Sequence, residues 1–219
     1  MGRFNRWSPP GQCTLPVALR PDLDRWAQAR AFAPSQDQFS GTTPFLRLGE
    51  LDTSDDAYAG QIDEHEAWIT EYSIGSPRAT AALGDMRLNI VSFTVFVVRV
   101  DASLWPRLTV HPARYSDHDL FRRLLHADHR VHTVSPEFDA HYRVIASEQI
   151  PDSQVGELFS SDLVSWWLAQ DPEICVDIEY HEREGGFLSV AHPGLGLDDS
   201  ALDQLLTQTQ RILSVTTTV

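Results

Sequence analysis

Apolar residues recur with a helical period near the start of the chain and change to a period of two further on. Leu23, Trp26 and Ala27 follow Pro21 at helical spacing, and Pro34 lies beyond them. Because proline is favoured in the first turn of a helix, this pattern predicts a helix that begins near Pro21.

The next segments alternate as strands do. Residues 56–62 and 66–74 are expected to form two strands joined by a tight turn. The run 88–100 has bulky apolar residues on both faces, which is typical of a central strand, and residues 107–111 predict a short fourth strand. Parallel strands need long crossovers, so these four consecutive strands favour an antiparallel meander.

Helical and alternating segments are mixed in the second half. Ser116 and Asp119 have the spacing of a helix cap, and residues 151–170 predict two short helices broken at Ser160-Ser161. Ser200 is expected to cap a last helix. The apolar stripe of that helix is wide enough to cover a sheet, and it consists of Ala201, Leu202, Leu205, Leu206, Ile212 and Leu213.

Three further segments of the second half alternate. Residues 138–147 predict one strand, and residues 173–180 and 187–192 predict a hairpin across a glycine turn. The expected fold class is therefore α+β, with an antiparallel sheet (a meander plus a C-terminal hairpin) packed against helices that include an amphipathic C-terminal helix. We expect one domain over residues 20–219, preceded by an irregular arm over residues 1–19.

Composition and charge narrow the classes of function. The chain has 219 residues and a formal net charge of −14, and its basic residues are scattered, so a nucleic-acid backbone or an anionic membrane would repel it. Its longest apolar run is shorter than the roughly 20 residues of a membrane helix. Cys13 and Cys175 are expected to be reduced thiols. We expect a cytoplasmic protein with no cofactor and with a protein partner.

One pattern in the second half resembles a known family. The pattern is Ser-x-Glu-Phe-x-x-x-Tyr-x-Val, present at Ser135, Glu137, Phe138, Tyr142 and Val144. It is similar to a strand motif of uncharacterised, mainly actinobacterial proteins (DUF3137-like). The similarity to this family is specific only over residues 134–190. The sequence departs from the family at Phe159-Ser160-Ser161, where the family has a proline. The resemblance implies a fold and supplies no catalytic residue.

Histidines cluster after the expected helix near residue 120. His126, His129 and His132 are spaced by three residues, with Asp128 between the first two. Imidazoles and carboxylates are preferred ligands of zinc and related metals, so these residues are candidates for a metal site. Surface histidines in a loop explain the cluster equally well.

Two more features are candidates for function. In the strand at 173–180, the face opposite its apolar residues carries Glu173, Asp177, Glu179 and His181, which could perform acid–base catalysis or could be the wet side of a half-covered sheet. Trp166 lies beside the apolar stripe of its helix. It is a candidate partner-binding residue, or it packs under a neighbouring element.

No nucleophile elbow, phosphate loop or His-Glu-x-x-His motif is present in the sequence. The sequence therefore favours a non-catalytic binding or accessory module that acts through protein contacts. The alternative is a metal-dependent or acid–base enzyme that uses the cluster from His126 to His132 or the face from Glu173 to His181. A module that binds a small apolar ligand between sheet and helices is a third hypothesis.

Overall fold

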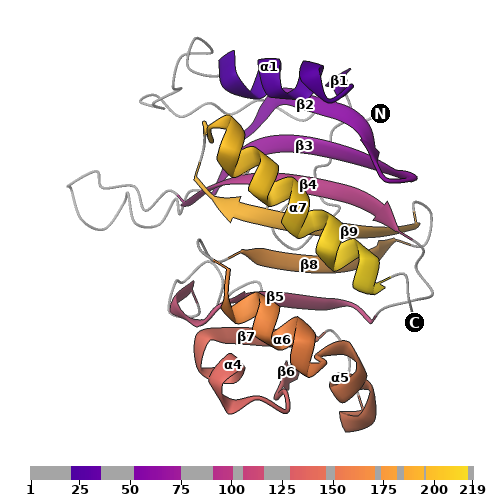
Figure 1. Ribbon diagram of the computed structural model, residues 1–219, viewed down its shortest axis with the longest axis vertical. Helices are drawn as coiled ribbons and strands as arrows, with labels where there is room; N and C mark the ends of the chain where they lie inside the picture. The colour runs from indigo at the N-terminus through magenta and orange to yellow at the C-terminus, as the bar shows by residue number, and fades with distance from the viewer. Residues whose placement is uncertain are drawn as a thin grey trace, which may run out of the picture.

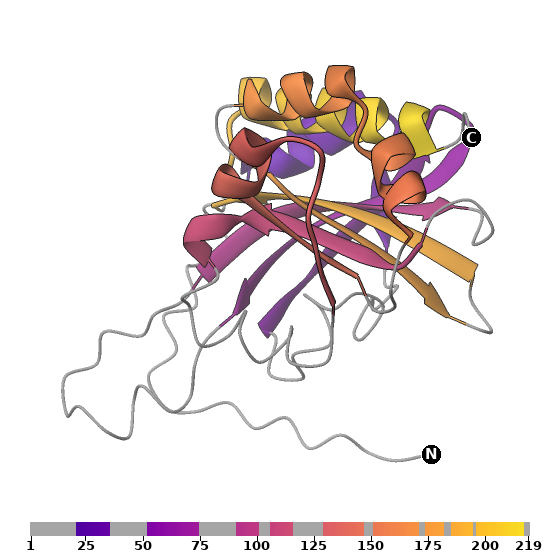
Figure 2. The ribbon, with the colours of Figure 1, turned by 90° about the horizontal axis from the view of Figure 1, so that it is seen from below.

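The computed structural model describes most of the chain, in nine segments. These are residues 21–35, 52–74, 91–100, 106–115, 129–146, 151–170, 174–181, 185–194 and 196–216. The expected arm at 1–19 and the expected cap at Ser116 and Asp119 lie outside them. Within these segments, strands build one sheet and the α-helices lie on one of its faces (Figures 1 and 2).

The described part of the chain contains both strands and helices. The strands are β1 (Ala33–Ser35), β2 (Asp52–Ile62), β3 (His65–Ile74), β4 (Val91–Val100), β5 (Leu108–Pro112), β6 (His129–Val131), β7 (Tyr142–Ala146), β8 (Cys175–His181) and β9 (Gly185–Pro193). The helices are α1 (Pro21–Ala29), the 3-10 helix η3 (Ala113–Tyr115), α4 (Pro136–His141), α5 (Asp152–Leu158), α6 (Ser161–Leu168) and α7 (Asp199–Thr216).

The sheet order is β1-β2-β3-β4-β9-β8-β5-β7-β6, and every neighbouring pair is antiparallel. The expected α+β class is confirmed, and β2, β3 and β4 form a meander. The fourth expected strand, β5, is not part of this meander, because the β8–β9 hairpin lies between it and β4. The long β9 pairs with β4 from Phe93↔Pro193 to Val100↔Gly186, which the five residues of β5 could not do.

Helix α7 covers the centre of the sheet, above β4 and β9 (Figure 1). Leu202, Leu205, Ile212 and Leu213 of its expected stripe are buried. The expected cap at Ser200 is wrong: Asp198 Oδ1 accepts a hydrogen bond from the Ala201 backbone N–H at 2.9 Å, and the helix begins at Asp199. The carboxylate two residues earlier satisfies the free N–H groups of the first turn.

Helix α1 is fastened to α7. Trp26 Nε1 donates to Asp203 Oδ1 at 2.9 Å, and Arg30 binds the same carboxylate while its guanidinium lies 4.5 Å above the Trp26 ring centre. Phe32, just after α1, contacts Trp26 and also lies close to Gly60 of β2, where a Cβ atom would come within 2.7 Å of its ring. The first helix therefore shares one core with the last helix.

A second cluster of aromatic residues lies under α4 and α6. Phe138 stacks on Tyr142 with ring centres 5.0 Å apart, and it also contacts Phe159 at 5.6 Å and Trp167 at 5.9 Å. The expected pair of helices with a break before Ser161 is confirmed, because Ser160 caps α6 by accepting from the Leu163 backbone N–H at 3.4 Å.

The strand expected over residues 138–147 is correct only from Tyr142 onward. Residues 136–141 form α4, whose N-cap is Ser135 with Pro136 in the first turn. The Ser-x-Glu-Phe part of the family-like pattern is therefore a helix start. Its alternation is accidental, because Phe138 and Tyr142, four residues apart, lie on one side of a helical turn.

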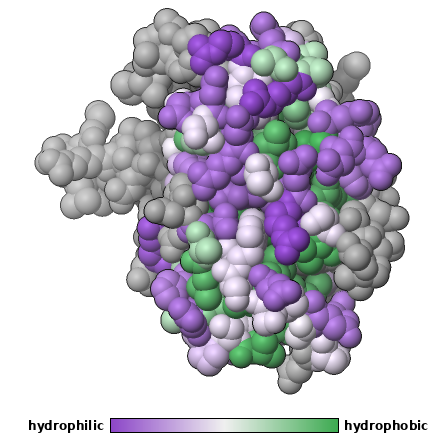
Figure 3. Space-filling view, viewed as in Figure 1, coloured by the Kyte–Doolittle hydropathy of each residue, from purple (hydrophilic) through white to green (hydrophobic). Residues whose placement is uncertain are grey.

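The outer surface of the helices is mixed in polarity. On this face, the residues that the structure describes present apolar patches separated by polar ones (Figure 3). In the part of the chain that is described, no helix combines the length and the apolar character that crossing a membrane requires.

Candidate functional site

The structure describes two of the three histidines of the cluster. His126 lies outside the described residues, His129 is exposed at the start of β6, and His132 is exposed just after β6. His132 Nδ1 lies 3.3 Å from Asp139 Oδ2. The described segments contain no group of three histidine, cysteine, aspartate or glutamate residues that could hold a metal ion.

The acidic face of β8 is not a wet surface. Asp177 is 0% exposed and Glu179 is 5% exposed, so the expectation of a solvated row is wrong for both residues; Glu173 lies outside the described part. Asp177 Oδ1 accepts from Thr109 Oγ1 at 2.6 Å, and Glu179 lies 3.6 Å from Arg107 Nε. Both carboxylates belong to an interior strand of the sheet, between β9 and β5.

Trp166 is half-buried. Its ring centre lies 6.0 Å from that of Trp167, and the side chain packs against the hydrophobic core while keeping part of its surface in solvent. The role of Trp166 in partner binding stays a prediction.

A row of polar side chains crosses three central strands on the helix side of the sheet. Glu71, Thr94 and His192 are direct cross-strand neighbours, and all three are buried. Glu71 Oε1 accepts from the Gly196 backbone N–H at 2.6 Å, which fastens the segment before α7. Carboxylate, hydroxyl and imidazole are the groups of a hydrolytic triad, but Thr94 is fully buried and donates to the Gly194 carbonyl at 3.0 Å. The row is therefore structural.

Two buried histidines have a pKa below the ordinary value in the folded protein. Burial lowers the pKa of His111 below its ordinary value, the Pro112 carbonyl that accepts from its Nδ1 at 3.0 Å opposes this, and the charge of Arg143 lowers the pKa further. Burial also lowers the pKa of His192. Removal from water disfavours the charged ring in both cases.

These two histidines predict a loss of stability in mild acid. Below their ordinary pKa of about 6.5 the unfolded chain takes up protons that the folded chain does not bind, so the free energy of unfolding falls as the pH falls. Each such proton contributes a slope of up to about 1.4 kcal/mol per pH unit. Urea unfolding between pH 7.5 and 5.5 measures the slope, and His111→Asn and His192→Asn should each make it shallower. An unchanged slope in both variants would contradict the assignment.

The junction of β6 and α4 carries an exposed apolar side chain. We call residues 129–135 together with Asp139 the β6–α4 corner. Val134 is 70% exposed and is the one large hydrophobic side chain that is exposed in the described part of the chain. Sequence reasoning missed Val134, because a single valine between threonine and serine carries no periodic signal.

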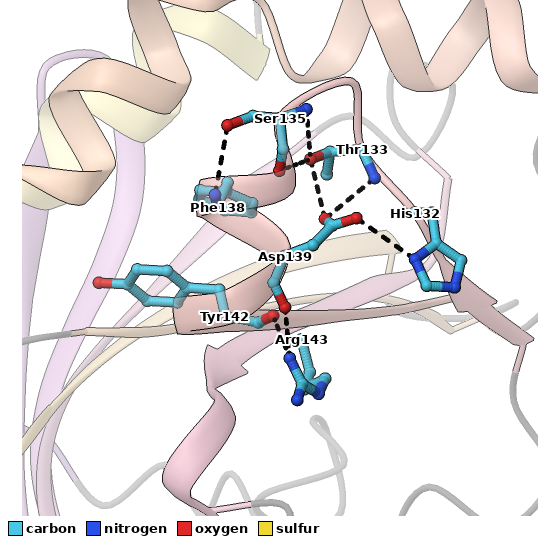
Figure 4. Close-up of polar contacts among 7 residues, drawn as sticks. All are labelled: His132, Thr133, Ser135, Phe138, Asp139, Tyr142 and Arg143. Carbon is cyan, nitrogen blue, oxygen red and sulfur yellow. Dashed lines mark hydrogen bonds and ion pairs between the residues drawn. The ribbon is translucent and has the colours of Figure 1, made fainter.

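Asp139 holds the corner from within α4 (Figure 4). Its Oδ1 accepts from the Thr133 backbone N–H at 3.0 Å and from Thr133 Oγ1 at 2.9 Å, while Oδ2 faces His132. A carboxylate that accepts several hydrogen bonds fixes the groups around it. The backbone on the N-terminal side of Val134 is therefore held in one conformation.

The C-terminal side of Val134 is held as well. Ser135 Oγ accepts from the Phe138 backbone N–H at 3.2 Å, and the Ser135 backbone N–H donates to Thr133 Oγ1 at 3.2 Å (Figure 4). Phe138 is fully buried in the aromatic cluster. The exposed valine thus lies on a backbone that the core positions, with polar side chains around it.

Strand β6 ends the described sheet. Its three residues pair with β7 from His129↔Ala146 to Val131↔Val144, and β7 is its one neighbour among the described strands. His129 and Arg130 are exposed, whereas Val131 is buried. An end strand presents backbone N–H and C=O groups that another chain can pair with.

Comparisons with protein-family models, with curated proteins and with solved structures each find no match for this chain. The family resemblance of residues 134–190 therefore stays a prediction.

Proposed function

We propose that this protein is a non-catalytic accessory module that binds another protein through the β6–α4 corner. The observation that carries the proposal is Val134, whose side chain is 70% exposed on a backbone held by Asp139 and Ser135. An exposed apolar side chain with polar neighbours has the layout of an interface centre and its polar rim.

Rigidity of the corner supports the same reading. Binding costs free energy for every side chain and loop that must be ordered, and a surface that is already ordered avoids that cost. Asp139 and Thr133 provide this order through the hydrogen bonds at 2.9 and 3.0 Å. A partner would cover Val134 with little rearrangement of the module.

The enzymatic alternative has less support in the described residues. Asp177 is bonded to Thr109, Glu179 lies close to Arg107, and His132 faces Asp139. Catalysis needs several groups that converge on a site that substrate can reach. Asp177 and Glu179 are buried, which favours a structural role for them.

Site-specific photo-crosslinking tests the proposal in the cells that make the protein. A p-benzoylphenylalanine at position 134 is expected to capture one defined protein, and the same residue at the exposed position 33, on the opposite end strand β1, is expected not to capture it. The captured protein is then purified, and its Kd for the accessory module is measured. Equal capture at both positions would overturn the proposed site.

Val134→Asp is expected to weaken that binding by at least about tenfold, because it places a charge in an interface that the valine would fill. Ala33→Asp adds the same charge elsewhere and should leave the Kd unchanged. The free energy of unfolding should change by less than about 0.5 kcal/mol, because position 134 is exposed. Trp166→Ala in the same assay tests the other candidate residue. An unchanged Kd for Val134→Asp would contradict the proposal.

A further inference from the structure

We infer that the segment bound at the β6–α4 corner is an extended, acidic stretch of the partner that pairs with β6 as an additional strand. This inference rests on the proposed function and specifies the chemistry of the partner. Two observations carry it: the outer edge of β6, with which no described strand pairs, and two arginines beside that edge.

Among the described strands, β6 has a neighbour on one edge alone. β6 pairs with β7 on one side, and the described part of the chain places no strand on the other. A strand that a partner adds at such an edge gains main-chain hydrogen bonds, and its alternate side chains determine specificity. Val134 follows β6 by three residues, at the bend before α4.

Two guanidinium groups lie beside this edge, on the face of the sheet away from the helices. Val131 and Val144 pair across the strands and belong to the core under the helices. Side chains alternate along a strand, so Arg130 and its cross-strand partner Ile145 point to the opposite face, as does Arg143. The two arginines therefore flank a half-buried isoleucine.

Neither arginine is neutralised by a carboxylate among the described residues. Arg130 is exposed and takes part in no ion pair there, while Arg143 Nη1 donates to the backbone carbonyls of Asp139 and Tyr142. Two arginines without a carboxylate partner in the described segments are locally complementary to an acidic segment.

The same charges argue against a second copy of this chain as the partner. Antiparallel pairing of two β6 strands centred on Arg130 would place this residue opposite its own copy, and like charges directly opposite each other are unfavourable. Two chains with a net charge of −14 also repel each other. Arg130 thus opposes self-pairing while it attracts glutamate or aspartate of another protein.

Synthetic peptides test the inference on the full chain. The probe is a capped eight-residue peptide of alternating glutamate and valine, and its Kd is measured by fluorescence anisotropy. The control is a peptide of the same length in which lysine replaces each glutamate. We expect this lysine–valine peptide to bind at least tenfold more weakly than the glutamate–valine peptide. A glutamate–valine peptide with N-methyl groups on alternate residues, which cannot donate along one edge, should lose binding as well.

Charge reversal provides the decisive comparison. Arg130→Glu should weaken binding of the glutamate–valine peptide at least tenfold and improve binding of the lysine–valine peptide. Arg211→Glu, at an exposed arginine of α7, should change neither affinity. Arg130→Ala, which adds no negative charge, should weaken the glutamate–valine peptide to a smaller extent. Thermal unfolding of each variant checks that the fold is intact.

The outcomes separate the inference from the proposed function. Absence of peptide binding, or binding that Arg130→Glu or N-methylation does not change, overturns strand addition by an acidic segment. The proposed function still stands in that case if Val134→Asp weakens binding of the crosslinked partner. If Val134→Asp leaves that partner's Kd unchanged while peptide binding follows the expected pattern, the proposed use of Val134 is wrong and edge pairing is retained.

Discussion

A chain that ends at Leu197 is expected to lose its cooperative unfolding transition. The shortened chain lacks all of α7, and with it the buried side chains of Leu202, Leu205, Ile212 and Leu213. It also lacks Asp203, which accepts from Trp26 and binds Arg30 of the segment around α1. The centre of the sheet would then expose a large apolar face to water, and burial of apolar surface is the main favourable contribution to folding.

Circular dichroism during heating measures the expected change, and binding of a dye specific for exposed apolar surface gives a second readout. A chain that ends at Thr216 is the matched control, because it keeps the whole of α7. The control should melt cooperatively. A cooperative melt of the chain that ends at Leu197 would show that the rest of the protein folds without α7.

Phe138→Ala is expected to lower the free energy of unfolding by about 3–5 kcal/mol, the usual range for truncation of a buried phenylalanine. Phe138 is fully buried and contacts Tyr142, Phe159 and Trp167, so its removal leaves a cavity that three elements border. Alanine is a better helix former than phenylalanine, so the loss cannot come from helix propensity. Urea unfolding measures it.

Two control variants on the same helix separate packing from other effects. Phe138→Leu keeps most of the apolar volume and should cost less than the alanine variant. Glu137→Ala, at the exposed neighbouring position, should change the free energy of unfolding by no more than about 0.5 kcal/mol. A loss below about 1 kcal/mol for Phe138→Ala would mean that the aromatic cluster does not hold the β6–α4 corner.

Local sequence patterns correctly predicted the helices and turns that depend on only a few neighbouring residues. The helix from Pro21, the turn between β2 and β3 and the break before Ser161 were all correct, because caps, turns and periodicity act over a few residues. At the tight turn Asp63 has φ of +53°, a conformation that aspartate tolerates better than most residues do. The class of the fold followed from the same patterns.

One error was local: residues 138–141 alternate as a strand would, but the Ser135 cap and Pro136 favour a helix there. The other errors came from contacts between distant residues. The burial of Asp177 and Glu179 differs from the expected wet face, because alternation along a strand does not show whether that face of the sheet is covered. The position of β5 followed from strand pairing and not from connection length.

The sequence singled out part of the segment that we propose as a binding site, but for a different chemistry. The spacing of His126, His129 and His132 indicated a candidate metal site, and His132 lies in the β6–α4 corner. The hydrogen bonds of Asp139 and the exposure of Val134 depend on where α4 docks, seven residues beyond His132. No local pattern encodes that docking.

The sequence by itself determined the acidic charge, the antiparallel α+β class, the stripe of α7 and the two short helices, because these follow from composition and from short-range periodicity. The tertiary structure alone decided the strand order, the burial of Asp177 and the exposure of Val134. The physical reason is that the burial of a side chain depends on which distant surfaces pack against it. In this protein the β8–β9 hairpin inserts beside β4, and the Phe138 cluster positions the β6–α4 corner.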